Sequence, residues 1–367
     1  MARTSADEFA VAQPAVDGSD GAALPDSLLE AVAMPYRVAG VEVVTTASIG
    51  VAVAQDAQRS AEELLRRAGA AVHRAKARGR HRWELHDPTD GDGAVERLHL
   101  LGQLRRSIDQ GGLVLHYQPR LDVQSRRAVG VEALVRWEHP TRGMVPPGEF
   151  IGLAEQSGLI RPLGVWVLRT AVEQAAAWAR SLPTPLEISV NLSARQLSDP
   201  NLIPTVRDAL DQYGLDPALL ILEITETALM EDAEAAVATL GQLKEIGVGL
   251  AVDDFGTGYA SLTYLRTLPL DELKIDRTFV DGVAHSPHDR AIVAGCIHLA
   301  HGVGLRAVAE GVETEEHHAA LVALGCDQAQ GYLYRRPVPA EELTRWVTGR
   351  AEIPTQATAP AARRRRA

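Results

Sequence analysis

The sequence predicts an α/β protein whose larger part is a closed barrel of alternating strands and helices. Three observations support this fold class. Apolar strands alternate with amphipathic helical stretches from residue 113 onward. About eight such strands fall within roughly 250 residues, which is the size of a (β/α)8 barrel rather than an open sheet. Most of these strands also end in a carboxylate, an amide or a lysine.

The strands and helices are expected in a regular order. Repeated strand-then-helix units indicate a parallel sheet. The strand segments are 113–117, 128–135, 186–190, 219–224, 248–252, 272–275, 305–309 and a short one near 329. Between them and ahead of them, helical periodicity is clearest at 94–109, 163–181, 233–246 and 289–301.

Breaks in composition divide the chain into four parts. We expect a small α/β region at 1–86, a polar linker at 87–96, the barrel at 97–349 and a tail at 350–367. Within the first part, Ser60 opens a helix and Glu63 completes a capping box. The tail ends in four arginines and lacks the apolar content needed to fold, so it is predicted to be a solvated, disordered end.

Charge and composition exclude several classes of function. The chain has 367 residues, a net charge of −11 and a pI near 5.6, which does not suit broad binding of a nucleic-acid polymer. Its two cysteines, Cys296 and Cys326, fit neither a disulfide scaffold nor a paired metal spacing. Neither a membrane-spanning apolar run nor a signal peptide is evident, and we expect a cytoplasmic protein.

The polar strand ends point to a functional site. In a (β/α)8 barrel the carboxyl ends of the strands form the active-site face. The residues expected to meet there are Glu132, Asn191, Glu223, Asp253, Asp254, Lys274, Glu310 and Gln330. Any one acid could instead cap a helix or pair with an arginine, but all of them share one face.

Five carboxylates at one face need positive charge to stay ionised together. Lys274 supplies one counter-charge and could assist water activation. Oxygen ligands suit hard divalent cations such as Mg²⁺, Mn²⁺ or Ca²⁺. The neighbouring Asp253 and Asp254 could bridge two ions, an arrangement that hydrolyses phosphodiesters.

These residues lie within motifs that resemble those of the EAL family of cyclic di-GMP phosphodiesterases. The matching blocks cover essentially all of 97–349 in family order: 117–119 (YQP), 132–137 (EALVRW), 191–194 (NLSA), 223–226 (EITE), 253–259 (DDFGTGY), 273–276 (LKID), 309–313 (AEGVE) and 330–332 (QGY). The resemblance implies a modified (β/α)8 TIM-type barrel with one antiparallel strand near its start.

The resemblance also implies hydrolysis of cyclic di-GMP to linear pGpG with two Mg²⁺ or Mn²⁺ ions. The implied metal ligands are Glu132, Asn191, Glu223, Asp253 and Asp254. Lys274 and Glu310 would act with Glu132 in catalysis, through the attacking water and the metals. The substrate would be bound by Gln118, Arg136, Asp276, Glu313 and Gln330, and Glu226 would anchor the glycine loop.

The first 86 residues resemble the second half of a GGDEF, or diguanylate cyclase, domain. The similarity lies in 48–50 (SIG), 61–65 (AEELL) and 75–80 (AKARGR), where Lys76 and Arg80 match phosphate-contacting positions. Ser5 and Ala6 stand where that family has the glycines of its signature turn. We therefore expect a truncated, degenerate remnant without cyclase activity.

Three other interpretations remain open. A catalytically idle barrel could sense cyclic di-GMP, although that reading favours a lost metal ligand and none is lost. A two-metal hydrolase could act on another phosphodiester, against which Gln118 and Arg136 weigh. The barrel could also be a scaffold without chemistry. A homodimer through the barrel is a further hypothesis taken from the resemblance.

Overall fold

In the computed structural model, the structure describes residues 2–3, 9–13, 23–34, 36–38, 41–43, 45–53, 60–77, 81–86, 93–231, 233–256 and 267–351. Ser5, Ala6, Arg80 and the predicted tail from residue 352 onward lie outside these ranges. The chain divides into two compact units, residues 1–100 and 101–367, which are described separately below.

The described part of the larger unit contains a closed barrel of eight strands, as the sequence predicted. They are β7 (Leu113–Asp122), β8 (Ala128–His139), β10 (Glu187–Leu192), β11 (Leu220–Thr225), β12 (Gly249–Phe255), β13 (Glu272–Ile275), β14 (Arg306–Ala309) and β15 (Gln328–Gln330). Pairing runs from β10 through β15 to β7 and β8, and a β8–β10 pairing closes the ring. The short strand β9 (Gly143–Val145) extends β8.

One barrel strand is reversed. β7 pairs antiparallel with β8 on one side and with β15 on the other, while the other pairings around the ring are parallel. This confirms the antiparallel strand that the family resemblance implied. A register shift between Arg120 and Leu121 marks an irregularity near the β7–β8 turn.

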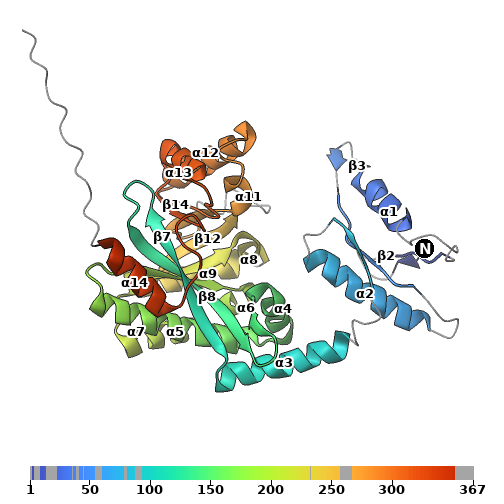
Figure 1. The fold of residues 1–367 in the computed structure, drawn as a ribbon, viewed down its shortest axis with the longest axis horizontal. Helices are drawn as coiled ribbons and strands as arrows, with labels where there is room; N and C mark the ends of the chain where they lie inside the picture. Colours follow the sequence, from blue (N-terminus) through green and yellow to red (C-terminus); the bar gives the residue numbers. More distant parts are fainter. Residues whose placement is uncertain are drawn as a thin grey trace, which may run out of the picture. The chain divides into compact units, whose positions relative to one another are not determined.

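Helices surround the barrel (Figure 1). They are α3 (Gly93–Gln110), α4 (Pro147–Ser157), α5 (Ile160–Ser181), α6 (Ala194–Leu197), α7 (Leu202–Tyr213), α8 (Glu226–Glu231), α9 (Ala233–Ile246), α11 (Arg277–Val280), α12 (Pro287–Gly302), α13 (Glu315–Leu324) and α14 (Ala340–Ala351). The predicted helices agree with α3, α5, α9 and α12 to within a few residues, the usual uncertainty of helix ends.

The longest helix, α5, shows why these segments pack as they do. Its buried residues recur at helical spacing and include Leu163, Val167 and Ala171. Near its end, Trp178 packs edge-on against Tyr117 of β7, with ring centroids 4.9 Å apart. The same indole donates a hydrogen bond to Thr344 Oγ1 at 2.8 Å. This contact fixes α5 and α14 against the reversed strand.

The described part of the smaller unit contains two antiparallel strand pairs and a two-stranded parallel sheet flanked by two helices. β1 (Ala2–Arg3) pairs antiparallel with β2 (Phe9–Ala10), and β3 (Tyr36–Val38) pairs with β4 (Val41–Val43). β5 (Ile49–Val51) pairs parallel with β6 (Trp83–Leu85), next to α1 (Ala23–Ala33) and α2 (Ala61–Ala77).

Two residues explain the local structure of this unit. The Glu63 N–H donates to Ser60 Oγ at 3.2 Å, which confirms the predicted start of α2. A Cβ on Gly50 would lie 1.9 Å from the Ala68 carbonyl oxygen. Only glycine therefore allows α2 to approach β5 this closely.

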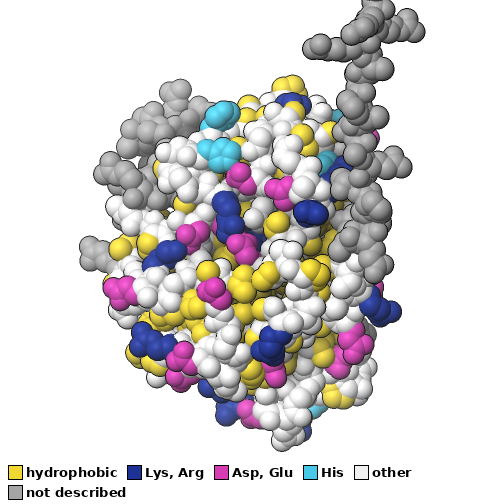
Figure 2. Space-filling view, turned by 90° about the vertical axis from the view of Figure 1, so that its left-hand side faces the viewer, with side chains coloured by type: hydrophobic (Ala, Val, Ile, Leu, Met, Phe, Trp, Pro, Cys, Tyr) yellow, Lys and Arg dark blue, Asp and Glu magenta, His cyan; other side chains and the backbone are white. Residues whose placement is uncertain are grey.

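The surface carries mixed charge. On the face drawn in Figure 2, acidic and basic side chains are interspersed among neutral and apolar ones. None of the described helices combines the length and the apolar content needed to span a bilayer.

Candidate active site

Glu132 on β8 is held by two amide side chains. Asn191 Nδ2, at the end of β10, donates to Glu132 Oε1 at 2.8 Å. Gln330 Nε2, at the end of β15, donates to Glu132 Oε2 and lies 3.4 Å from Gln118 Oε1. Gln118 is the residue opposite Glu132 in the β7–β8 register. Four predicted site residues from four strands thus meet here.

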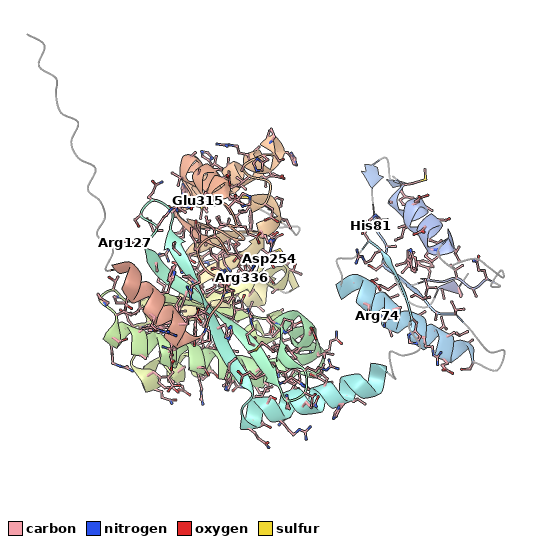
Figure 3. All side chains as sticks on the ribbon, viewed as in Figure 1. Arg74, His81, Arg127, Asp254, Glu315 and Arg336 are labelled. Atoms are coloured by element: carbon pink, nitrogen blue, oxygen red, sulfur yellow. The ribbon has the colours of Figure 1, made fainter. Side chains whose placement is uncertain are left out.

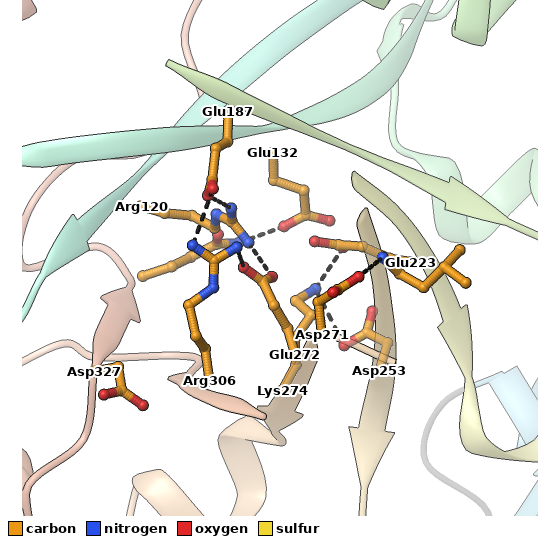
Figure 4. A network of polar contacts seen from close by, with 12 residues as sticks. Arg120, Glu132, Glu187, Glu223, Asp253, Asp271, Glu272, Lys274, Arg306 and Asp327 are labelled. Carbon is orange, nitrogen blue, oxygen red and sulfur yellow. Dashed lines mark hydrogen bonds and ion pairs between the residues drawn. The ribbon is translucent and has the colours of Figure 1, made fainter. Parts of the chain in front are cut away.

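A second group surrounds Lys274 on β13 (Figure 4). Its ammonium lies 2.6 Å from Glu223 Oε2, 3.1 Å from Asp253 Oδ1 and 2.6 Å from Glu310 Oε1. Lys274 and Glu223 have no exposed side-chain area. The lysine is therefore a buried cation shared by acids from β11, β12 and the end of β14.

The pKa values of Glu132 and Lys274 reflect their mutual attraction. Burial disfavours the ammonium, but Asp253, Glu132 and the other acids hold the pKa of Lys274 well above its ordinary value. Burial also disfavours the Glu132 carboxylate. Lys274 and the hydrogen bonds from Gln330 and Asn191 nevertheless bring the pKa of Glu132 below its ordinary value.

The raised pKa values of the other acids show that Lys274 alone does not neutralise the carboxylates of the site. Burial raises the pKa of Glu223 to about 7, with Glu132 and Asp253 adding to the rise and Lys274 opposing it. Burial and the neighbouring Asp253 raise the pKa of Asp254 to about 6. The site thus holds more negative charge than its own cation neutralises.

This excess of carboxylates fits a divalent cation. Oxygen atoms of Asp253, Asp254 and Glu310 lie within 4.8 Å of one another, close enough to share an ion. Within the described part of the chain, Glu223 Oε1 is buried and has no hydrogen-bond partner. A set of carboxylate and amide oxygens is what Mg²⁺ or Mn²⁺ prefers. The acidic cluster could therefore bind metal.

Asp254, labelled in Figure 3, lies near the end of β12 in an unusual backbone conformation. Asp254 has a φ of +54°, a left-handed conformation that aspartate tolerates better than most residues. Its N–H donates to Asp253 Oδ1 at 2.9 Å. Two residues on, the N–H of Gly256 donates to Glu226 Oε2 at 3.0 Å. Glu226 thus holds the start of the glycine loop, whose remainder lies beyond the described residues.

Comparison with known families gives this arrangement a context. Residues 101–337 match the EAL domain family, and residues 1–82 match the family described as the diguanylate cyclase, GGDEF domain. The chain belongs to the EAL domain family. A partial GGDEF domain precedes its EAL domain.

Curated relatives align over nearly the whole chain. The bifunctional diguanylate cyclase/cyclic di-GMP phosphodiesterase MucR of Pseudomonas aeruginosa is 43% identical, over 94% of this chain and 50% of its own length. The cyclic di-GMP phosphodiesterase NbdA of the same organism is 40% identical, over 94% of this chain and 44% of its own. The chain thus spans about half the length of these relatives.

Solved structures match the EAL domain. The PaMucR phosphodiesterase in complex with c-di-GMP is 48% identical with a TM-score of 0.65, and the match covers 67% of this chain and 99% of that one. The EAL domain of Mycobacterium smegmatis DcpA is 36% identical with a TM-score of 0.56, covering 65% and 97% of the two chains.

Three predicted substrate-binding residues form hydrogen bonds or ion pairs with residues outside the two groups around Glu132 and Lys274. Arg136, half-buried on the Glu132 strand of the EAL domain, donates to the Val135 carbonyl at 2.9 Å. Asp276 accepts from the Thr278 N–H at 2.9 Å and caps α11. Aspartate is a favoured N-cap residue, so the capping role of Asp276 could have been predicted from the sequence alone.

Glu313, the third of these, forms an ion pair with Arg277 Nη2 at 3.0 Å. Sequence reasoning had not named Arg277. Tyr332, the last residue of the 330–332 (QGY) block, and Arg336 follow β15 of the EAL domain, and their contact was not predicted. The Arg336 guanidinium lies 4.1 Å from the centre of the Tyr332 ring, a cation–π contact. No spacing rule links an arginine to an aromatic residue four positions earlier in a loop.

Proposed function

We propose that the EAL domain hydrolyses cyclic di-GMP to linear pGpG, using two Mg²⁺ or Mn²⁺ ions. This proposal rests mainly on the excess of carboxylates around the buried Lys274. The residues that supply these carboxylates are those that match the family motifs. The relatives named as cyclic di-GMP phosphodiesterases and the c-di-GMP complex of a 48% identical chain support the choice of substrate.

The proposed ligands of the ions are the carboxylate and amide oxygens of Glu132, Asn191, Glu223, Asp253 and Asp254. Bound ions would polarise the phosphodiester and supply an activated water at neutral pH. Asn191 Oδ1 remains available to a cation because its Nδ2 is the atom that contacts Glu132. Gln330 and Asn191 keep the Glu132 carboxylate in one orientation.

The remaining residues have roles that follow from their contacts. Lys274 keeps Glu223, Asp253 and Glu310 close together despite their mutual repulsion. Burial raises the pKa of Glu310 well above its ordinary value, so this group could accept or hold a proton near the attacking water. Arg136 would bind a substrate phosphate through its guanidinium fork, and Gln118 would contact the substrate beside Glu132.

The direct test is turnover by the purified chain. We expect cyclic di-GMP and Mg²⁺ or Mn²⁺ to yield pGpG, detected by reverse-phase chromatography. EDTA should abolish the product, and added Mn²⁺ in excess should restore it, because the acids need a cation to bind the substrate phosphate. Tight binding of cyclic di-GMP without turnover would contradict the enzyme and identify a sensor.

Glu226→Ala is expected to lower kcat by about 10–100-fold, the usual effect of removing a group that supports a metal ligand. The loss of the Oε2 acceptor releases the Gly256 N–H and with it the backbone next to Asp254. Glu226→Gln retains an acceptor oxygen and should keep more activity. Steady-state rates of both variants check this, and equal loss in the two would exclude anchoring through the Gly256 N–H.

We propose that the partial GGDEF domain makes no cyclic di-GMP. Support comes from Ser5 and Ala6, which replace the glycines of the family's signature turn. GTP with Mg²⁺ should yield neither cyclic di-GMP nor pGpG. MucR, which is named as bifunctional, is the positive control. Because the EAL domain would consume the product, the assay should be repeated in the Glu132→Ala variant.

A further inference from the structure

Below the candidate site, four charged side chains form a closed ring, which we call the floor ring (Figure 4). Arg120 lies 2.6 Å from Glu272 Oε2 and 2.9 Å from Glu187 Oε2. Arg306 contacts the second oxygen of each glutamate, at 2.7 Å from Glu272 and 2.9 Å from Glu187. Two positive and two negative charges alternate, so the ring as a whole is neutral.

The floor ring crosses the barrel lumen. Its members come from β7, β10, β13 and β14, and Arg120 reaches two strands that are not neighbours of its own. Arg120 and Glu272 have no exposed side-chain area, whereas Glu187 and Arg306 are 20% and 42% exposed. The ring is thus anchored in the centre of the barrel and opens toward solvent on one side.

Each member shares its strand, or the end of its strand, with a residue of the candidate site. Alternate residues of a barrel strand point inward, so positions two or four apart share the lumen. Arg120 is two residues from Gln118 and Glu272 is two residues from Lys274. Glu187 and Arg306 are four residues from Asn191 and Glu310. The ring and the site therefore share the inward-facing positions of the same strands, one inward position apart on β7 and β13 and two apart on β10 and β14.

Gly130 makes room for this layer on the Glu132 strand. It is opposite Arg120 in the β7–β8 register and two residues before Glu132. A Cβ at this position would lie 3.0 Å from Arg120 Nη2, 3.1 Å from its Nε and 3.1 Å from the Glu187 carbonyl oxygen. Any larger residue would press on the guanidinium, so the glycine and the buried arginine are matched.

We propose that Arg120 and Glu272 are positioning residues that set the place of Gln118 and Lys274 in the site. A well-packed apolar layer would serve stability as well as, or better than, buried ion pairs. The ring's particular contribution is geometric, because two-pronged guanidinium contacts fix strand positions across the lumen. The kinetic part of this proposal rests on the proposed phosphodiesterase function, whereas its metal-binding part does not.

Replacing the buried half of the ring separates positioning from stability. Arg120→Met and Glu272→Met each take one of two ion-pair partners from the remaining buried charge and leave the ring with a net charge, so each should lower the melting temperature. The double variant removes both charges and keeps the Glu187–Arg306 pair, so the melting temperature should largely recover. We nevertheless expect its Mn²⁺ affinity, measured by calorimetry, and its kcat to stay at least tenfold below wild type. Arg105→Met, in an exposed ion pair, is the matched control.

The outcomes are distinct. Recovery of melting temperature, Mn²⁺ affinity and kcat together in the double variant would overturn the proposal, since the ring would then be structural only. If wild type does not hydrolyse cyclic di-GMP, the proposed function fails, and the Mn²⁺ affinities alone decide on positioning. If the double variant does not fold, the single variant Glu272→Met, which removes both acceptor oxygens from the ring, replaces it. Wild-type Mn²⁺ affinity in folded Glu272→Met would equally overturn the proposal.

Discussion

Glu132→Ala is expected to lower the turnover of cyclic di-GMP by at least about 100-fold. Loss of groups that only support metal ligands costs about 10–100-fold, and Glu132 is itself a proposed ligand. The substitution also leaves the Asn191 and Gln330 amides without the carboxylate that orients them. Steady-state rates at saturating Mn²⁺ measure the effect.

A matched control for this variant lies on the same strand. Glu138 is an exposed acid on β8, and Glu138→Ala removes the same atoms at the surface. Its turnover should remain close to wild type. If Glu132→Ala retained a rate within about threefold of the control, Glu132 could not be a metal ligand in the reaction.

Lys274→Met is expected to destabilise the metal-free protein by about 3–5 kcal/mol, the usual result of removing one partner from a buried ion pair. The substitution leaves Glu223, Asp253 and Glu310 close together without their shared cation. Urea unfolding in EDTA measures the loss. Turnover should also fall strongly, because the acids lose the charge that holds them in place.

Added metal should stabilise the Lys274→Met variant against unfolding more than it stabilises wild type. A divalent ion replaces part of the missing positive charge, so Mn²⁺ should raise the unfolding midpoint of Lys274→Met further than that of wild type. Lys244→Met is the control, because Lys244 and Asp271 form a partly exposed pair at 2.8 Å and should contribute little. An unchanged midpoint of Lys274→Met in EDTA would contradict the prediction.

Local patterns explain why so much of the barrel could be predicted from the sequence. The pattern of an apolar strand followed by a polar residue predicted β10 to β14. The same pattern predicted the site residues at the ends of these strands, including Asn191 and Glu223. The direction of β7 could not be read this way, because an apolar strand has the same pattern in either direction. Only the family resemblance indicated the reversal.

The floor ring was missed for a different reason. Glu187 and Arg306 are the first residues of their strands, where a charged side chain usually indicates solvent. Arg120 lies beyond residue 117, where the sequence prediction ended the strand, whereas β7 continues to Asp122. Its burial depends on partners far away in the chain. The presence of two ions and the homodimer remain predictions.

The floor ring also limits the side from which a substrate or product can reach the candidate site. Arg120 and Glu272 have no exposed side-chain area, so the barrel interior is closed at this layer and offers no path from one end of the barrel to the other. On the proposed function, the linear dinucleotide would have to leave from the same strand-end face that bound the cyclic one. Reactant and product would therefore exclude each other, and accumulated pGpG would slow the removal of cyclic di-GMP.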